Sequence, residues 1–346
     1  MGKAISDIMQ DLVSLTEDEK RMIISELSNM LIRGELKNYS QEEMTEKRFA
    51  HDKKYPYCDG TTGVIKDGLH KGKQRFYCKA CKKTFGERTN TIMFSSKRPF
   101  EKWMQFAWCL VRGFSLNRCH EEVGISVRTA FFWRHKLMRT NGKIMKSDQV
   151  DGVVEADETY FLESFKGQKN ADWKIIGRQP FKRGGSATKR GVSSEQVCVI
   201  CSLDRLGHIL SDVVGKSRPT QASVDKFFAG RITPDSILCT DTQNSFAAFA
   251  RTIGIQIKQI PTGKHKIDIY HIQHVNSYHS SLKGWMLRFK GVSTKYLNNY
   301  LYWFKWITSH KGLRERDNAH QIISAAYTAD FNIRWDDFKN ITQVAA

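Results

Sequence analysis

The chain has 346 residues, 40% of them hydrophobic, which is enough for two or three cored domains and excludes global disorder. It carries 55 Lys and Arg against 36 Asp and Glu, and this net charge of +19 favours a polyanionic partner. The N-terminus lacks the apolar core of a signal peptide, and no apolar run approaches the ~18 residues that span a bilayer, so no membrane partner is expected. The eight cysteines are not spaced like a secreted disulfide framework, which favours a reducing cytoplasm.

Residues 1–48 alternate apolar and charged residues at helical spacing and predict a small helical pair. Thr16 followed by Glu19 has the spacing of a capping box, which would begin the second helix. The pattern assigns no role to this segment.

Residues 49–92 predict a zinc-ribbon-like hairpin. Cys78 and Cys81 form a Cys-x2-Cys half-site, and Cys58 lies where the other half would be. Tyr55 stands where a standard ribbon begins with Cys, so three cysteines leave a tetrahedral zinc site one ligand short, and His51 could supply the fourth. The alternative is a metal-free hairpin of the same shape.

Residues 93–145 predict a helix-turn-helix DNA-binding domain, in which residues 99–139 read as entirely helical. Leu116 to Val123, a turn at Gly124 and a helix capped by Ser126 match the spacing of a helix-turn-helix. The basic side chains on or near its second helix are then candidate DNA contacts: Arg128, Arg134, His135 and Arg139. The alternative is an ordinary helical hairpin with solvated charges.

The pattern changes to strands in residues 146–310. The expected strands are 153–156, 196–203, 208–214, 236–240 and 255–260, with helices at 221–228, 245–251 and 275–289. Residues 204–207 predict a hairpin turn between the second and third strands. Three antiparallel strands followed by strand-helix alternation predict a mixed α/β fold with an RNase H-like sheet. Residues 311–346 are left as a C-terminal tail.

A basic insertion at residues 165–191 separates the first two of these strands. It holds eight Lys or Arg residues against one acid, and counterion release rewards such a cluster on a phosphate backbone. Its candidate DNA contacts are Lys182, Arg183, Lys189 and Arg190. The alternative is a solvated surface insertion. Cys198 and Cys201 also have x2 spacing, but they lie in an apolar strand and are interpreted as strand residues.

Two aspartates and an asparagine stand in contexts that predict chemistry. Asp157 and Asp241 directly follow apolar strand-like runs, and Asn276 lies on a helical pattern. Carboxylate and amide oxygens that converge in this way form a divalent-metal site for phosphoryl transfer, with Mg²⁺ or Mn²⁺ as the ion. A neutral third ligand removes one negative charge, so metal affinity should fall unless substrate phosphates or waters compensate.

The helix that carries Asn276 adds further candidates. Asn276, His279 and Lys283 share one face at i, i+3 and i+7, and Lys283 could contact a phosphate oxygen. The competing carboxylates near the three candidate ligands are Glu155, Glu158 and Asp268, the last of which could replace Asn276. A zinc site made of His265, His271, His274 and His279 fits no common ligand spacing.

At these residues the chain resembles bacterial insertion-sequence transposases of the fifteen-ninety-five (XO-two-like) family. The family's Asp-Glu-Thr-Tyr segment is found at residues 157–160, and its Thr-Asp before an aromatic-rich helix at residues 240–241. The third motif spaces a His, an acidic residue and a Lys as His271, Asn276 and Lys283 do here. The usual Glu is thus Asn, a variant that some branches of the family carry.

The resemblance implies a DDE-type transposase with Asp157, Asp241, Asn276 and Lys283 in the catalytic site. It implies double-stranded DNA as the partner, both as terminal inverted repeats and as target, with cleavage at the element ends followed by strand transfer. Pairing two ends implies a homodimer or larger complex in a bacterial, nucleoid-associated setting. The alternatives are a DNA-binding regulator derived from an inactive transposase and a structure-selective nuclease of RNase H type.

Overall fold

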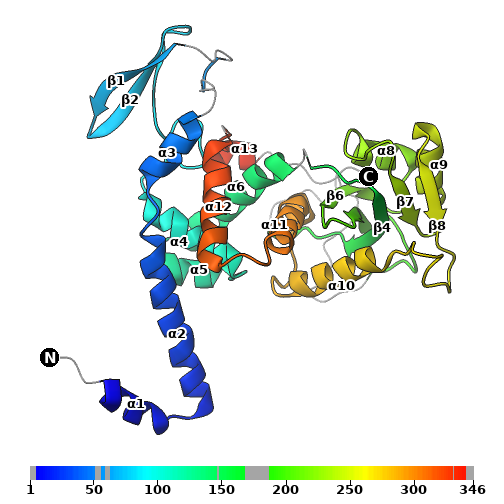
Figure 1. Ribbon diagram of the computed structural model, residues 1–346, viewed down its shortest axis with the longest axis horizontal. Helices are drawn as coiled ribbons and strands as arrows, with labels where there is room; N and C mark the ends of the chain where they lie inside the picture. The colour runs from blue at the N-terminus through cyan, green and yellow to red at the C-terminus, as the bar shows by residue number, and fades with distance from the viewer. Residues whose placement is uncertain are drawn as a thin grey trace.

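Three helices and a small antiparallel sheet form the N-terminal part of the chain. The computed structural model describes residues 5–50, 56–58, 63–145, 148–167, 187–329 and 331–339. The first elements are α1 (Ile5–Val13), α2 (Glu17–Leu36), α3 (Gln41–Ala50), β1 (Val64–His70), β2 (Lys73–Cys78) and β3 (Thr84–Gly86). The predicted capping box is confirmed, because Thr16 and Glu19 exchange side-chain-to-backbone hydrogen bonds at the start of α2. The structure has three helices here, where the sequence predicted two. Helix α2 extends away from the rest of the molecule (Figure 1).

Helices α4 (Phe100–Val111), α5 (Leu116–Val123) and α6 (Val127–Met145) follow, as the sequence predicts. Gly124 ends α5 in the left-handed region at φ 67°, where glycine avoids the strain that a side chain would bring. The Ser126 hydroxyl accepts the N–H of Thr129 and caps α6. The turn between the two helices thus has the chemistry that the sequence indicates.

A five-stranded mixed sheet lies beside this helical part. The remaining elements are β4 (Val153–Leu162), β5 (Gln196–Asp204), β6 (Ile209–Lys216), α8 (Gln221–Phe228), β7 (Ile237–Thr240), α9 (Asn244–Ile253), β8 (Gln256–Gln259), α10 (Gln273–Leu287), η1 (Thr294–Tyr296), α11 (Leu297–Ser309), α12 (Glu315–Thr328) and α13 (Trp335–Lys339). The strand order is β6-β5-β4-β7-β8, with the first three strands antiparallel and β7 and β8 parallel to β4. The predicted mixed α/β architecture is confirmed.

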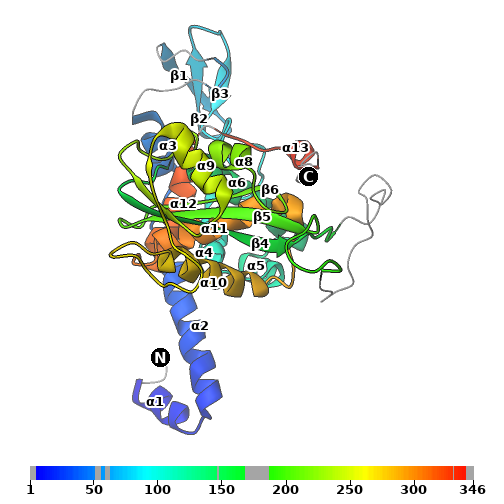
Figure 2. The ribbon, with the colours of Figure 1, turned by 90° about the vertical axis from the view of Figure 1, so that its right-hand side faces the viewer.

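The two faces of this sheet are covered by different helices (Figure 2). Val154 and Ala156 of β4 face α8 and α9, whose buried phenylalanines complete one core. The alternate residues of β4 point the other way, toward α10. A one-residue alternation therefore assigns Glu155 and Asp157 to the α10 face.

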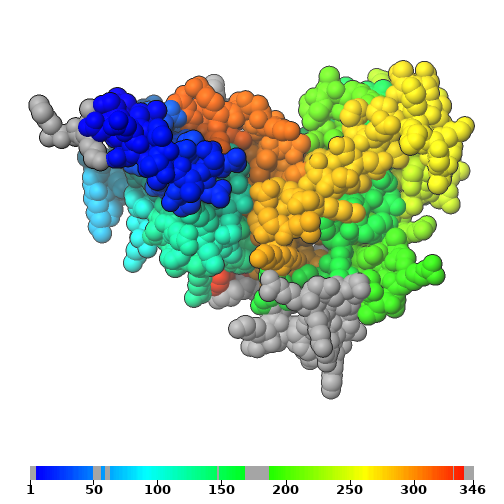
Figure 3. Space-filling model, turned by 90° about the horizontal axis from the view of Figure 1, so that it is seen from below, coloured from blue at the N-terminus to red at the C-terminus, as the bar shows by residue number. Residues whose placement is uncertain are grey.

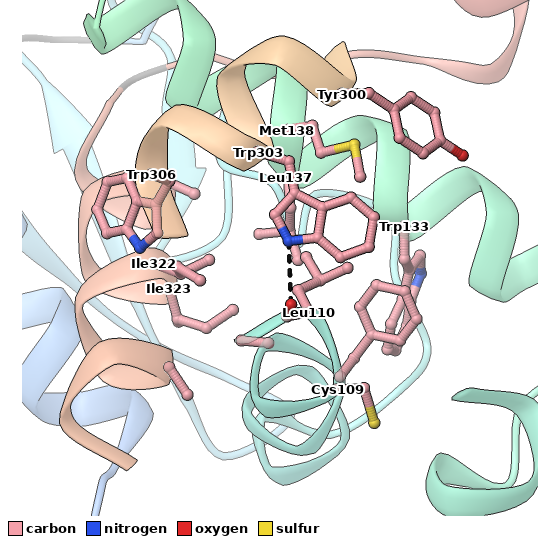
Figure 4. Packing of buried hydrophobic residues seen from close by; sticks show 14 of the residues in the cluster. Cys109, Leu110, Trp133, Leu137, Met138, Tyr300, Trp303, Trp306, Ile322 and Ile323 are labelled. Carbon is pink, nitrogen blue, oxygen red and sulfur yellow. Dashed lines mark hydrogen bonds between the residues drawn. The ribbon is translucent and has the colours of Figure 1, made fainter. Parts of the chain in front are cut away.

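A second core continues from this face into the helical part of the chain. It joins side chains of α4, α5, α6, α10, α11 and α12 with Val197 and Cys201 of β5. The indole N–H of Trp303 in α11 donates to the carbonyl of Leu110 at the end of α4, at 3.0 Å (Figure 4). The domain boundary placed between residues 145 and 146 thus crosses a continuous hydrophobic core.

Helix α12 corrects the expectation of a tail after residue 310. It packs along α4 and buries Ala319, Ile322, Ile323 and Tyr327. The sequence interpretation missed it because its apolar residues are mixed with polar ones that are also buried, such as Asn318, which accepts the indole N–H of Trp306 at 2.7 Å.

Gly142 gives a direct test of the packing between α6 and α11. A Cβ at this position would overlap the ring of Tyr302, so Gly142→Ala should lower the free energy of unfolding by about 2 kcal/mol through overpacking. Gly284→Ala in α10 is the matched control, because nothing lies within 4 Å of its Cβ position and alanine favours a helix by about 0.5–1 kcal/mol. Denaturant unfolding measures both variants, and equal stabilities would contradict the packing described.

Candidate active site

Three carboxylates meet where β7 ends beside β4. The parallel pairing of these strands sets Glu155 opposite Cys239, so Asp157 and Asp241 come level two residues later. One oxygen each from Asp157, Glu158 and Asp241 lies within 4.8 Å of the other two. The two predicted aspartates are brought together, and Glu158, a competing carboxylate in the sequence, joins them.

Asp241 is held at the junction between strand and helix. Its Oδ1 accepts the N–H of Gln243 at 2.9 Å, just before α9 begins. Its backbone carbonyl accepts the Thr240 hydroxyl at 2.8 Å and the Gln259 amide at 3.3 Å. These hydrogen bonds, from the end of β7, from β8 and from the residue before α9, hold the backbone and the carboxylate of Asp241 in place.

Glu158 reaches the cluster from the opposite face of β4, because neighbouring residues of a strand alternate. The pairing of β4 with β7 ends at Glu155, which leaves the edge beside Asp157 and Glu158 without a strand partner on that side among the described residues. The Tyr160 hydroxyl donates to Glu158 Oε1 at 3.3 Å. Glu158 Oε2 is buried and has no hydrogen-bond partner in the described chain, which leaves it available to a cation.

Burial and mutual repulsion perturb this cluster. Burial first, and then the charges of Glu158 and Asp241, raise the pKa of Asp157 to about 7, while Lys283 acts in the opposite direction. Burial and the charge of Asp241 also raise the pKa of Glu158. A divalent cation would neutralise the repulsion between these carboxylates and favour their ionised forms.

Helix α10 supplies the other side of the site. His279 Nδ1 lies 3.7 Å from Asp157 Oδ2, and its Nε2 is buried without a hydrogen-bond partner among the described residues. Burial, assisted by the charge of Lys283, lowers the pKa of His279 to about 4. The imidazole is therefore neutral at pH 7 and can act as a ligand or a hydrogen-bond partner there.

Asn276 and Lys283 lie one turn before and one turn after His279. The contacts of α10 advance along β4 from Glu155, at Val275, to Asp157, at His279, so the helix runs in the same direction as the strand. Asn276 is exposed on the edge of the helix that His279 and Lys283 share. Asn276 thus shares a helix face with His279, the residue of α10 that meets Asp157.

Buried Glu155 fixes the start of α10. Its Oε2 accepts the backbone N–H groups of His274 and Val275 at 2.8 and 3.1 Å, and its Oε1 lies 3.0 Å from the Arg205 guanidinium. His271 and His274 also gather here, with Nδ1 atoms 3.2 and 2.7 Å from Glu155 Oε1. One ligand atom each of Glu155, His271 and His274 lies within 4.8 Å of the other two, and the Arg205 guanidinium already balances the Glu155 charge at this point. We therefore interpret the cluster as an anchor for the start of α10. The signal for Glu155 in the sequence was its place two residues before Asp157.

Comparison with known proteins identifies the domain that carries these residues. Residues 149–308 match the ISXO2-like transposase domain. An uncharacterized protein in transposable element ISH50 of Halobacterium salinarum is 24% identical over 255 residues, which cover 71% of this chain and 82% of that protein. Among solved structures, a chain of the Mos1 transposase paired-end complex with left transposon end matches at 12% identity. The match covers 67% of this chain and 81% of that one, with a TM-score of 0.22.

The match of residues 149–308 to this domain, together with the likeness to the transposable-element protein, supports a transposase of the ISXO2-like family. A domain of this family implies an enzyme that cleaves DNA and transfers strands. Transposases of this kind use divalent metals, and the three carboxylates are an acidic site suited to them. No helix within the described ranges is long and apolar enough to cross a membrane.

The predicted DNA contacts on α6 of this transposase differ in accessibility. Arg128 is exposed, with its guanidinium 4.8 Å from the ring centre of Trp335, and Arg139 is half-buried. Arg134 and His135 are a correction, because both are buried. Arg134 donates to the Phe114 carbonyl, and His135 packs among the aromatic rings of η1, α11 and α13. Neither side chain can reach a phosphate in this arrangement.

In the basic insertion, Lys189 and Arg190 are exposed. They follow Thr188, whose backbone N–H donates a hydrogen bond to Glu195. Lys182 and Arg183 lie outside the described residues, as does most of the insertion. Cys198 and Cys201 are buried in β5, which confirms them as strand residues.

The cysteines of the N-terminal sheet gather as expected. Cys58 Sγ lies 3.9 Å from Cys78 Sγ, and the N–H of Cys81 points to Cys78 Sγ at 3.4 Å. The pKa of Cys78 is lowered: burial opposes this, but the backbone N–H groups of Cys81 and Ala80 and the neighbouring thiols outweigh it. A lowered thiol pKa suits a metal ligand. His51 lies outside the described residues.

The raised pKa of Asp157 predicts a pH-dependent gain in stability for Asp157→Asn. The folded state binds this proton more tightly than the unfolded state, so wild-type stability falls as pH rises from near 3.8 to about 7. The neutral amide escapes this loss and should be more stable than wild type by about 2 kcal/mol at pH 8 in chelator, with the difference shrinking toward pH 4. Exposed Asp235→Asn serves as the control in denaturant unfolding, and identical wild-type and Asp157→Asn curves at pH 8 would contradict the electrostatic account.

Proposed function

We propose that this transposase binds the terminal inverted repeats of its element and uses Mg²⁺ or Mn²⁺ to cleave the ends and join them to target DNA. The observation that carries the proposal is the convergence of Asp157, Glu158 and Asp241 within 4.8 Å, inside the residues that match the transposase domain. Oxygen ligands of this kind are those that Mg²⁺ and Mn²⁺ take in phosphoryl-transfer enzymes.

An RNase H-like organisation of residues 146–310 supports this assignment. The central strand β4 carries one aspartate, the end of its parallel neighbour β7 carries the second, and α10 lies across the same edge. This arrangement explains why residues more than a hundred positions apart in the chain serve one site. We take it as the catalytic domain.

Asp157, Asp241 and Asn276 would hold the metal ions, and we add Glu158 to this set. The pKa of Asp157, raised to about 7, and the buried orphan oxygen of Glu158 both fit a site completed by a cation. Glu158 also restores the negative charge that Asn276 lacks as a neutral ligand. The bound metal supplies charge neutralisation at the reacting phosphate and activation of the attacking oxygen.

The remaining side chains of the site bind and orient the DNA. Lys283, whose charge acts on Asp157, would pair with a phosphate oxygen on the side of α10. His279 is neutral at pH 7 and keeps Nε2 for an acceptor or donor of the substrate. Glu155 positions both residues through its hold on the start of α10.

The N-terminal modules would deliver the DNA to this site. Helices α5 and α6 form the helix-turn-helix, with exposed Arg128 at the start of α6 as its main phosphate or base contact and half-buried Arg139 about three turns further along the helix. Lys189 and Arg190, together with Lys182 and Arg183, would contact the phosphate backbone.

Cleavage of a labelled terminal-repeat duplex tests the catalytic assignment. Asp157→Ala and Asp241→Ala should reduce Mg²⁺-dependent cleavage by about 10³-fold or more, since each removes metal-bound charge, while DNA affinity stays at the wild-type level. Glu158→Gln, an uncharged isostere, should reduce cleavage by at least about tenfold and raise the metal concentration for half-maximal activity.

Asp235→Ala is the matched control, because this aspartate is exposed near the start of β7 and lies outside the cluster. Undiminished cleavage by Asp157→Ala and Asp241→Ala would reject the site. Sequence-specific binding without cleavage by the wild type would instead favour the regulator derived from an inactive transposase.

Zinc in the N-terminal sheet would be held by Cys58, Cys78 and Cys81, with His51 as the proposed fourth ligand. Purified protein should then contain about one zinc ion per chain by elemental analysis. Cys78→Ser and Cys81→Ser should lose the zinc, whereas Cys201→Ser should keep it, because Cys201 lies in a strand and is hydrogen-bonded to Ser211. Purified wild type without bound zinc would contradict the proposed zinc site.

A further inference from the structure

The N-terminal arm, defined as residues 5–36 of α1 and α2, stands apart from the rest of the molecule (Figures 1 and 2). Only the second half of α2 is anchored, through buried Asn29 and Leu36 and through an ion pair between Arg33 and Glu122 of α5. Arg316 of α12 adds a 3.0 Å pair with Glu35. The catalytic and DNA-contact residues proposed above all lie outside this arm.

Helix α2 carries an apolar stripe on the side that faces away from these anchors. Ile24, Leu27 and Leu31 are 64%, 53% and 72% exposed, and their spacing of three and four residues is that of one seam of a coiled coil. Asn29 and Leu36, which contact the body, lie on the other side of the helix. The stripe is therefore not a by-product of the packing that holds α2 in place.

Helix α1 also exposes apolar side chains along one face. Ile5, Ile8, Met9 and Val13 recur at helical spacing and are 46–80% exposed, and no residue of α1 is buried. Viewed from below, the two helices form one projecting surface at the N-terminal end of the molecule (Figure 3). A monomeric protein rarely leaves so many large apolar side chains together in water.

The charge of the arm narrows the class of partner. It holds seven acids against three basic residues, a net charge of −4, in a chain whose net charge is +19. Nucleic acid and anionic lipid are both repelled by such a surface, although the rest of the chain would attract them. An apolar, acidic arm on a basic protein fits a protein surface as its partner.

We propose that the arm docks on a second copy of this chain and forms the dimer contact of the transposase. Its 32 residues supply the roughly 20–30 residues per side of a standard protein interface. A seam with coiled-coil spacing pairs with its own copy around a two-fold axis, which buries both stripes at once. The seam residues themselves are uncharged, and outside the seam the acidic charge of each arm is complementary to the basic remainder of the partner.

The mass of the full-length protein in DNA-free solution tests this proposal. Wild type should have the mass of two chains at micromolar concentration by light scattering or sedimentation. Leu27→Asp with Leu31→Asp places two charges in the seam and should raise the dimer dissociation constant on the order of 100-fold. The matched control is Ser25→Asp with Asn38→Asp, which adds the same charge to exposed positions outside the stripe and should leave the dimer intact.

Because Leu27 and Leu31 are exposed, their replacement should leave the circular dichroism spectrum and the melting temperature of the monomer unchanged. A wild type with the mass of one chain throughout the micromolar range would overturn the proposal, as would a stripe variant that keeps the mass of two chains.

The effect of the dimer on DNA cleavage and joining rests on the proposed function, and a separate assay measures it. The stripe variant should still cut single ends but should lose products in which two ends are joined together. Failure of the wild type to cut any DNA would reject the proposed function without changing the measured masses, so the two failures are distinguishable.

Discussion

One buried carboxylate, Glu155, ties the central strand of the sheet to the helix that completes the site. It accepts two free N–H groups at the start of α10 and holds Arg205 at the same point. Because α10 then runs along β4 in register, His279 meets Asp157, and the edge of the helix with Asn276 and Lys283 is fixed with it. The geometry of the site thus depends on a residue that need not touch the reacting phosphate at all.

The cluster that Glu155 helps to shape is unfavourable in isolation. Burial and repulsion raise the pKa of Asp157 to about 7, and Glu158 keeps a buried oxygen without a hydrogen bond. The fold tolerates this because the hydrophobic cores on both faces of the sheet stabilise the strands that carry the carboxylates. The stored repulsion favours binding of a cation, so the same interaction that lowers stability raises metal affinity.

Local patterns were sufficient for most elements and for the pair of aspartates. Strand runs predicted β4 and β7, and carboxylates that follow parallel strands meet at one edge, so Asp157 and Asp241 could be placed from the sequence. Glu158 could not, since strict alternation assigns it to the other face of β4, although one of its oxygens lies within 4.8 Å of ligand atoms of both aspartates. Arg134 was misjudged for a tertiary reason: α6 is covered by α4, α11 and α12, and a buried guanidinium can pack on Trp303, at 5.0 Å from the ring centre.

The continuous core between α6 and the sheet limits how this transposase can present DNA to its carboxylates. Side chains of α4, α6 and α11 pack together without a break, so α5 and α6 cannot rotate freely against the sheet. Arg128, at the start of α6, is exposed, and its position relative to Asp157 is set by the fold. The projecting arm, outside this core and free of DNA-contact residues, is the part of the molecule best placed to bring a second chain within reach.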